Sequence, residues 1–199
     1  MTDLVIATTN AGKLQEFTAL LQHLPITLIN PKELGLILSV KEENDSYFDN
    51  ARRKAQAYAE KSGRWTIADD TGLEVDVLEG APGLKSARLA GPGRSDADRR
   101  ILLLSMLIPH PRPWSACFHC TVVLAGPKGT IDSAQGTCEG EIIHQERGVH
   151  GFGYDPIFLL TDQQKTMAEL TMEEKNRLSH RAHAVNAILP ILEERLEIE

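Results

Sequence analysis

The feature that most constrains the fold is a short apolar run at the start of the chain that leads through a polar turn into an amphipathic stretch. Leu4 to Thr8 predict a buried strand, and Thr9 to Gly12 predict the turn. From Leu14 to Leu24, apolar residues then recur at helical spacing. A strand, a loop and a helix in this order indicate an α/β protein.

Later helices are indicated by residue pairs that can cap a helix start. These pairs are Ser46 with Asp49, Ser95 with Asp98 and Thr171 with Glu174. We expect Phe48 to belong to the buried stripe of the helix after Ser46. A last helix is expected after Ser179, running toward Leu196, with a kink at Pro190.

Two other stretches predict strands. WTIADDTGLEVDVL, from Trp65 to Leu78, predicts a strand, a tight turn at Asp-Asp-Thr-Gly and a second extended piece. From Ser115 the apolar residues alternate, and GPKG then predicts the turn of a hairpin whose return strand begins at Thr130.

The composition excludes several classes of protein. With 199 residues, 42% of them apolar, the chain is expected to form one globular domain over residues 1–199. A net charge of −7 argues against a broad nucleic-acid surface, although a local basic pocket remains open. We expect no membrane span and no signal peptide. Three cysteines are typical of a reducing compartment, which predicts a cytoplasmic location.

The TTNAGK turn is a candidate phosphate site. The N-terminus of a helix presents unpaired N–H groups and a partial positive charge, to which Lys13 would add a full one. The spacing departs from that of a P-loop, and taken alone the segment also fits an ordinary tight loop.

Asp69, Asp70 and Thr71 are candidates for metal chemistry because they follow a predicted strand. Two adjacent carboxylates repel each other, and Mg²⁺ would relieve this repulsion while also binding substrate phosphates. The same residues also fit turn chemistry. The acidic loop with Glu42 and Glu43 offers another carboxylate, or an ordinary solvated charge run.

Two further segments are candidates for binding a nucleotide base. Gly148 to Pro156 combine three glycines with two aromatic residues, so the backbone can approach a ligand on which a ring stacks. Lys175, His180 and Arg181 gather positive charge near the start of the last helix, where the helix dipole does not favour cations. The alternatives are a glycine-rich turn with core aromatics and a solvated surface.

Cys117 and Cys120, with His119 between them, suggest a zinc or thiol-redox module. Residues three apart on a strand point to opposite faces, so we expect these cysteines to pack in the sheet.

Taken together, these segments resemble the inosine triphosphate pyrophosphatase family, which acts on non-canonical purine nucleoside triphosphates. The resemblance rests on ATTNAGKLQEF, FDNARRKA, IADDTGLEVDVL, GAPGLKSARLAG, FHC, GFGYDPIF and AELTMEEKNRLSHRAHA, which occur in this order. It implies an α/β fold with an elongated mixed sheet flanked by helices, and two lobes with a central substrate cleft.

The resemblance also implies a reaction: hydrolysis of dITP, ITP and XTP to the monophosphate and pyrophosphate, cleansing the nucleotide pool. It implies Asp70 as the general base, one or more Mg²⁺ ions per subunit on Glu42 and Asp70, and Lys54 as a further phosphate contact. Glu43 remains an alternative to Glu42. The residues it assigns to substrate binding are Thr8, Thr9, Asn10, Ala11, Gly12, Lys13, Thr71, Phe152, Gly153, Tyr154, Asp155, Lys175, His180 and Arg181.

Two positions depart from the family pattern. His150 stands where a small residue is usual, and Leu89 stands where an aromatic residue is common. The resemblance further implies a homodimer. The open alternatives are a pyrophosphatase for other modified or pyrimidine triphosphates, and a nucleotide-binding regulator without catalysis.

Overall fold

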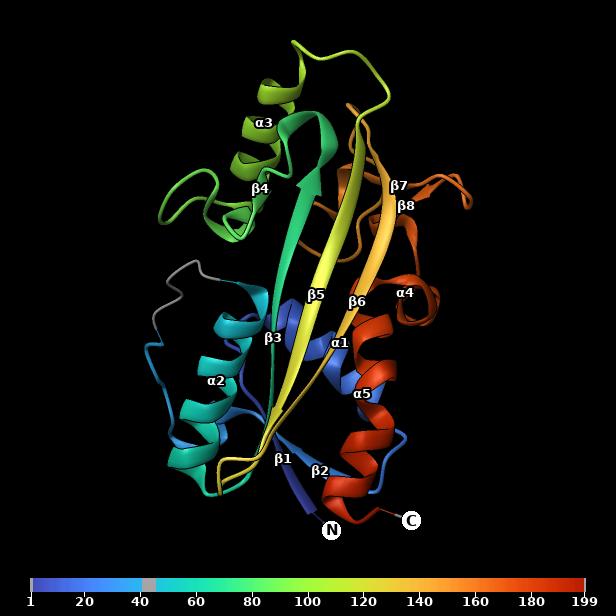
Figure 1. Cartoon of the computed structure of the whole chain (residues 1–199). Helices are drawn as coiled ribbons and strands as arrows, with labels where there is room; N and C mark the ends of the chain where they lie inside the picture. Colours follow the sequence, from blue (N-terminus) through green and yellow to red (C-terminus); the bar gives the residue numbers. More distant parts are fainter. Residues whose placement is uncertain (1, 41–45, 199) are drawn as a thin grey trace. The chain divides into compact units, whose positions relative to one another are not determined.

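A computed structural model describes residues 2–40 and 46–198 of the chain, and it has a mixed α/β fold (Figure 1). The chain divides into two compact units. Unit 1 comprises residues 1–70, 120–136 and 180–199, and unit 2 comprises residues 71–119 and 137–179. Within the described residues, no helix is long and apolar enough to cross a membrane.

The α-helices are α1 (Ala11–Leu21), α2 (Tyr47–Ser62), α3 (Asp96–Leu107), α4 (Met172–Leu178) and α5 (His180–Leu196). The strands are β1 (Thr2–Ile6), β2 (Ile26–Ile29), β3 (Trp65–Val75), β4 (Pro82–Gly83), β5 (Ser115–Ala125), β6 (Ile131–Ile142), β7 (Phe158–Leu160) and β8 (Lys165–Thr166). Short 3₁₀ helices occupy Pro31–Leu34, Asp76–Leu78, Ser86–Arg88, Asp155–Ile157 and Met167–Glu169.

The strands form one sheet in the order β2-β1-β3-β5-β6-β7-β8, and β4 pairs with β3. β1 runs parallel to both β2 and β3, with Leu4 opposite Leu28 on one side and Trp65 on the other. The pairs β3–β4, β6–β7 and β7–β8 are antiparallel. The mixed sheet flanked by helices that the resemblance implied is therefore confirmed, whereas the substrate cleft stays a prediction.

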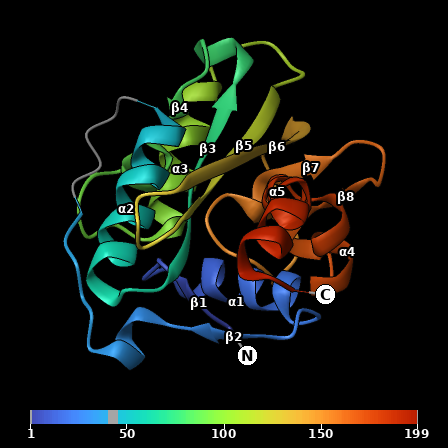
Figure 2. The same ribbon diagram turned by 60° about the horizontal axis from the view of Figure 1, so that its bottom comes forward.

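In unit 1 the sheet is covered on both faces. On one face α1 and α5 pack against the strands through a large apolar cluster that includes Phe17, Leu21 and Ile188. On the other face α2 packs through small residues, among them Ala51 and Ala55. Figures 1 and 2 both place α2 on one side of β3 and α5 on the other. Because each face of the sheet is covered, a side chain on β3 meets a different helix depending on the direction in which it points.

Unit 2 has its own core. Leu103 and Leu107 of α3 pack with Val75 of β3 and with aromatic residues, and Phe118 and Phe158 lie with ring centroids 4.6 Å apart. These five buried side chains, from α3, β3, β5 and β7, belong to one core cluster of unit 2.

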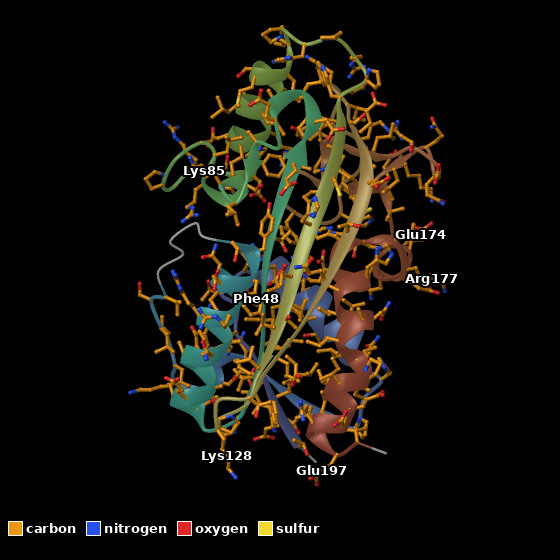
Figure 3. The ribbon with its side chains drawn as sticks, in the orientation of Figure 1. Phe48, Lys85, Lys128, Glu174, Arg177 and Glu197 are labelled. Carbon is orange, nitrogen blue, oxygen red and sulfur yellow. The ribbon has the colours of Figure 1, made fainter. Side chains whose placement is uncertain are left out.

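The predicted helix starts are confirmed. The hydroxyl of Ser46 accepts the N–H of Asp49 at the start of α2, and Ser95 and Thr171 form capping boxes with Asp98 and Glu174. Glu174 projects from α4 (Figure 3). The β5–β6 hairpin turns at Gly126–Thr130, as expected from GPKG.

Two expectations are wrong. Phe48 of α2, labelled in Figure 3, remains 36% exposed rather than joining the buried stripe. The Asp-Asp-Thr-Gly segment forms no turn, because β3 runs continuously from Trp65 to Val75. Pairing explains the continuity: β5 lies beside β3 in the sheet, β1 and β4 pair with the two ends of β3, and the N–H of Leu73 donates to Ser86 Oγ at 2.8 Å. These long-range contacts outweigh the local turn preference.

Candidate active site

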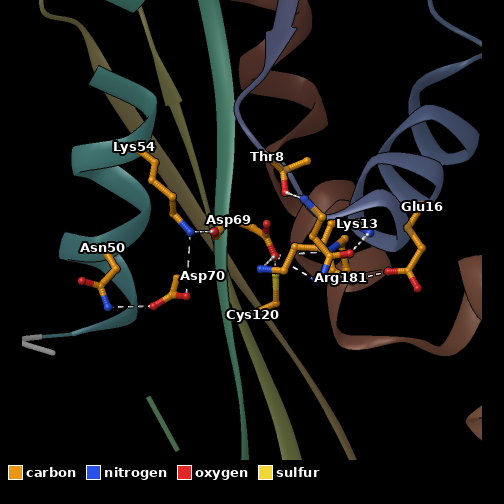
Figure 4. A network of polar contacts seen from close by, with 10 residues as sticks. Thr8, Lys13, Glu16, Asn50, Lys54, Asp69, Asp70, Cys120 and Arg181 are labelled. Atoms are coloured by element: carbon orange, nitrogen blue, oxygen red, sulfur yellow. Dashed lines mark hydrogen bonds and ion pairs between the residues drawn. The ribbon is translucent and has the colours of Figure 1, made fainter. Parts of the chain in front are cut away.

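The two adjacent aspartates of β3 point in opposite directions (Figure 4). Successive side chains of a strand alternate between the faces of the sheet, so a continuous β3 must separate Asp69 from Asp70. Asp69 points toward α1 and α5, and Asp70 points toward α2. The expected repulsion between carboxylates at a turn is therefore wrong, and the two side chains have different partners.

Asp69 is the centre of a buried ionic network. Its Oδ2 lies 3.0 Å from Lys13 Nζ, and it accepts hydrogen bonds from Arg181 Nη2 at 2.8 Å and Nε at 3.2 Å. The side chains of Asp69 and Arg181 are only 2% and 1% exposed. The Cys120 thiol lies 3.9 Å from the same oxygen. Two cations thus meet one desolvated carboxylate.

Glu16 completes this network, because its carboxylate pairs with the other side of the Arg181 guanidinium. Burial raises the pKa of Asp69, but the charges of Lys13, Arg181 and Lys54 outweigh burial and hold this pKa well below its usual range. Burial lowers the pKa of Arg181, but Asp69 and Glu16 raise it further, so the guanidinium keeps its charge. The carboxylate of Asp69 and the guanidinium of Arg181 are therefore both charged at neutral pH.

Asp70 has polar partners on the α2 face. Asn50 Nδ2 donates to Asp70 Oδ2 at 2.9 Å, and Lys54 Nζ lies 3.9 Å from Asp70 Oδ1. Lys54 Nζ also donates to the backbone carbonyl of Asp69 at 2.5 Å. These distances place a carboxylate, an amide and an ammonium group around one position of β3.

The amide of Asn50 also bears on metal binding. Its Oδ1 is buried and has no hydrogen-bond partner in the part of the chain that the structure describes. Mg²⁺ prefers oxygen ligands and needs only one or two protein carboxylates when it also binds phosphates and waters. The oxygens of Asp70 and Asn50 are therefore a donor set of the right chemistry for Mg²⁺.

The N-terminus of α1 follows β1 after a loop of residues 7–10. Asn10 caps the helix by accepting the N–H of Lys13 at 3.0 Å, and Thr8 Oγ1 accepts the N–H of Asn10 at 3.2 Å. The first turn, residues 11–13, contains no acidic residue, whereas the first turns of α2, α3 and α4 each contain one or two. The α1 terminus therefore keeps its partial positive charge available to an anion.

In unit 2, Asp155 organises the glycine-rich segment that was predicted to bind a base. Its Oδ2 accepts the N–H of Phe152 at 2.9 Å and a hydrogen bond from Lys175 Nζ at 2.6 Å. Lys175 Nζ lies 5.2 Å from the centroid of the Phe152 ring. At Gly151 (φ +75°) an added Cβ would lie 2.0 Å from Asp155 Oδ2, so only glycine fits there. Tyr154 is buried and donates to the carbonyl of Ser86 at 2.8 Å.

The predicted site residues fall into two groups. Thr8 to Lys13, Asp70, His180 and Arg181 belong to unit 1, and Thr71, Phe152 to Asp155 and Lys175 belong to unit 2. Arg181 was predicted to contact the base, and it is found between Asp69 and Glu16. Its role toward the base stays a prediction. Glu42 and Glu43 lie outside the described residues.

Four residues of these clusters were not predicted from the sequence. Glu16 and Asn50 belong to the two aspartate networks, and Asp96 and Arg100 of α3 contact Gly153. Asn50 lies within the motif FDNARRKA, which was a usable signal. Glu16 follows Lys13 by three positions, a spacing that places both on one face of α1, and this too was a signal.

The fold and these charged groups define the class: a mixed α/β protein with two lysines, an arginine and two aspartates gathered around one strand. The chain belongs to the Ham1 family, whose model matches residues 4–191.

Relatives and solved structures agree with this assignment. The chain is 43% identical to a dITP/XTP pyrophosphatase of Desulforamulus reducens, over 95% of this chain and 94% of that protein. It is 41% identical to a dITP/XTP pyrophosphatase of Halalkalibacterium halodurans, over 94% of this chain and 97% of that protein. The solved structure of a HAM1 protein from Coxiella burnetii superposes with a TM-score of 0.87 at 37% identity, covering 98% of this chain and 100% of the other.

Proposed function

We propose that this chain is a nucleoside triphosphate pyrophosphatase that hydrolyses dITP, ITP and XTP to the monophosphate and pyrophosphate. Membership of the Ham1 family and near full-length similarity to dITP/XTP pyrophosphatases support this activity. The observation that carries the proposal is Asp70, a carboxylate beside Lys54 and Asn50 on the strand next to β1. In the cell, this reaction would remove deaminated purine nucleotides from the triphosphate pool.

The start of α1 and the helix α2 carry the groups proposed to bind the phosphates. The N-terminus of α1 attracts anions through its dipole, and the N–H groups of its first turn point along the helix axis toward such a ligand. Lys13 in this turn and Lys54 on α2 carry the full positive charges. On substrate binding, we expect Lys54 Nζ to leave Asp70 Oδ1, which lies 3.9 Å away, and to pair with a phosphate oxygen. The phosphate oxygen is the stronger charged partner.

Phe152 and Lys175 are the residues proposed to recognise the base. The ring of Phe152 offers a stacking surface, and Lys175 above this ring is a hydrogen-bond donor with a fixed direction because Asp155 holds it. A donor suits the six-keto oxygen of hypoxanthine and xanthine and would face the amino group of adenine unfavourably. The resemblance adds His180 and Arg181 to these contacts.

The chemistry would proceed at Asp70. This carboxylate accepts the proton of the attacking water, and the amide of Asn50 keeps it oriented through the 2.9 Å hydrogen bond. Lys13 and Lys54 stabilise the charge that develops on the phosphates. The oxygens of Asp70 and Asn50, with Glu42 from the resemblance, would hold Mg²⁺, which when bound makes water more acidic and neutralises phosphate charge. A homodimer and a cytoplasmic location complete the proposal.

The test is a panel of triphosphates incubated with the purified chain. We expect pyrophosphate from dITP, ITP and XTP, little from dATP or dTTP, no activity in EDTA, and recovery with added Mg²⁺. Asp70→Asn should lower hydrolysis by about 10²–10⁴-fold. Asp132→Asn is the matched control because it makes the same change at a carboxylate that pairs with Arg195. Binding of ITP without any hydrolysis would contradict the proposal and support a regulator.

A further inference from the structure

The first turns of α3 hydrogen-bond to the backbone of Gly153 in the glycine-rich segment. Asp96 Oδ2 accepts the Gly153 N–H at 2.7 Å, and Arg100 Nη1 donates to the Gly153 carbonyl at 2.8 Å. Asp96 and Arg100 are four positions apart, so both side chains lie on one face of α3. One helix face therefore satisfies both backbone polar groups of this glycine.

These two contacts fix more than one residue. The N–H of Gly153 belongs to the peptide group shared with Phe152, and its carbonyl belongs to the peptide group shared with Tyr154. Gly153 has φ +61°, in the left-handed region, where glycine moves more freely than any other residue. Holding both peptide groups removes the freedom that a glycine would otherwise give to the residues on either side.

The side chains that hold Gly153 are themselves held. Arg100 donates to both carboxylate oxygens of Glu146, through Nε at 2.8 Å and Nη2 at 2.9 Å, and its side chain is only 12% exposed. Asp96 pairs with Arg99, which also donates to the backbone carbonyl of Arg94 at 2.9 Å. A bidentate pair has a defined geometry, so the guanidinium of Arg100 is pre-oriented toward Gly153.

Phe152 is affected directly. Its own N–H is bound by Asp155, and its carbonyl carbon belongs to the peptide group whose N–H is bound by Asp96. Both ends of the Phe152 backbone are therefore fixed by carboxylates, which sets the direction of the bond that carries the ring. The ring lies under Lys175, the donor proposed to read the base.

We infer that Asp96 and Arg100 are positioning residues for base recognition, which set the place of the Phe152 ring through the backbone of Gly153. The inference rests on the proposed function, because it concerns how the purine is distinguished. Neither residue is expected to touch the substrate. Small misplacements of positioning groups have large effects on rates and discrimination. The selectivity for hypoxanthine over adenine therefore depends on α3.

The experiment compares Asp96→Ala, Asp96→Asn and Arg100→Ala with the unaltered chain. Steady-state kinetics with dITP and dATP give KM, kcat and the ratio of the two kcat/KM values, and amide hydrogen exchange gives the protection of residues 152–155. The control is Arg195→Ala in unit 1, which also removes an arginine that donates two hydrogen bonds to one carboxylate. Arg195 Nε and Nη2 donate to the two carboxylate oxygens of Asp132 at 2.9 and 3.2 Å.

For Asp96→Ala and Arg100→Ala we expect faster exchange of the Gly153 amide. Since each change removes a hydrogen bond to a charged group, we expect KM for dITP to rise and the preference for dITP over dATP to fall by about tenfold. The value of kcat should change by less than about twofold, because the reacting phosphates are not held by this segment. Asp96→Asn keeps an acceptor for the Gly153 N–H and should restore most of the preference, and Arg195→Ala should match the unaltered chain.

An unchanged preference in both alanine variants, with exchange at Gly153 accelerated, would overturn the inference. An equal fall in kcat for both nucleotides, tracking a loss of thermal stability, would also overturn it, because that pattern reports unfolding rather than positioning. Failure of the proposed function is distinguishable, since the unaltered chain would then cleave none of the triphosphates.

Discussion

Asp69 and Asp70 are adjacent and chemically identical, yet the same substitution should affect them in opposite ways. In Asp69→Asn, the buried Arg181 and Lys13 both lose the carboxylate of Asp69, and Arg181 keeps its pair with Glu16. Removing one partner of a buried ion pair typically lowers the free energy of unfolding by about 3–5 kcal/mol. For a chain of this length, that loss lowers the midpoint of thermal unfolding by about 6–20 °C.

Asp70→Asn should leave stability nearly unchanged. The new side chain still offers an oxygen to the amide of Asn50, and the ammonium of Lys54 retains the carbonyl of Asp69. We expect a change within about 1 kcal/mol. Hydrolysis of dITP, however, should fall by about 10²–10⁴-fold, because the general base is lost.

Thermal unfolding followed by circular dichroism, together with pyrophosphate release from dITP, separates the two effects. Equal destabilisation by the two variants would refute the assignment of Asp69 and Asp70 to opposite faces of β3. An Asp69→Asn variant as stable as the unaltered chain would refute the buried network as a stabilising element.

Acidification gives an independent check of Asp69. The pKa of its carboxyl is held well below the usual range in the folded chain, so its contribution to stability is fully present above the unfolded value of about 3.9. This contribution is lost as pH falls through the folded pKa. The unfolding midpoint should therefore fall less steeply below about pH 4 in Asp69→Asn than in the unaltered chain.

Three further predictions concern packing, charge and thiol chemistry. Gly136→Ala places a Cβ 2.3 Å from backbone atoms of α5 and should cost about 1–3 kcal/mol or more, measured by thermal unfolding. Lys175→Met leaves the buried carboxylate of Asp155 without its cation, so we expect a loss of about 3–5 kcal/mol and a higher KM for dITP, measured by unfolding and kinetics. Burial raises the pKa of the Cys138 thiol to about 12, so this thiol should resist a disulfide reagent near pH 8 until the chain unfolds, as followed by absorbance.

Much of the secondary structure could be predicted because its signals are local. A capping serine or threonine acts on N–H groups three residues away, so the starts of α2, α3 and α4 depend on neighbours in the sequence. The continuity of β3 could not be predicted in this way. Asp-Asp-Thr-Gly has the composition of a turn, and its place in a strand that β5 flanks, with β1 and β4 paired to the two ends, keeps it extended.

The error in β3 also explains what was missed at the site. A turn would have kept both aspartates together and suggested one metal site with two carboxylates, whereas a strand divides them between two helices. The residue types indicated which chemistry to expect, but the sequence did not indicate which of these residues contact each other. Glu16 looks like an ordinary helix carboxylate in the sequence, and only the fold brings Arg181 of the last helix to it.

The positive charge at the start of α5 has a physical explanation in this network. Arg181 follows the first residue of the helix, where the helix dipole disfavours a cation by about 0.3–1 kcal/mol. Buried contacts with Asp69 and Glu16 outweigh that cost.

The balance of charges around β3 also gives a reason to expect a bound divalent metal ion. Among the described residues of the two aspartate networks, the three cations Lys13, Lys54 and Arg181 are matched by three carboxylates, those of Glu16, Asp69 and Asp70. A triphosphate adds several negative charges to groups that already balance. Lys13 and Lys54 can turn to the phosphates only by weakening their contacts with the aspartates, which would leave carboxylate charge uncompensated. A divalent cation would offset both the phosphate charge and the uncompensated carboxylate charge. This is the physical reason to expect a magnesium requirement in this chain.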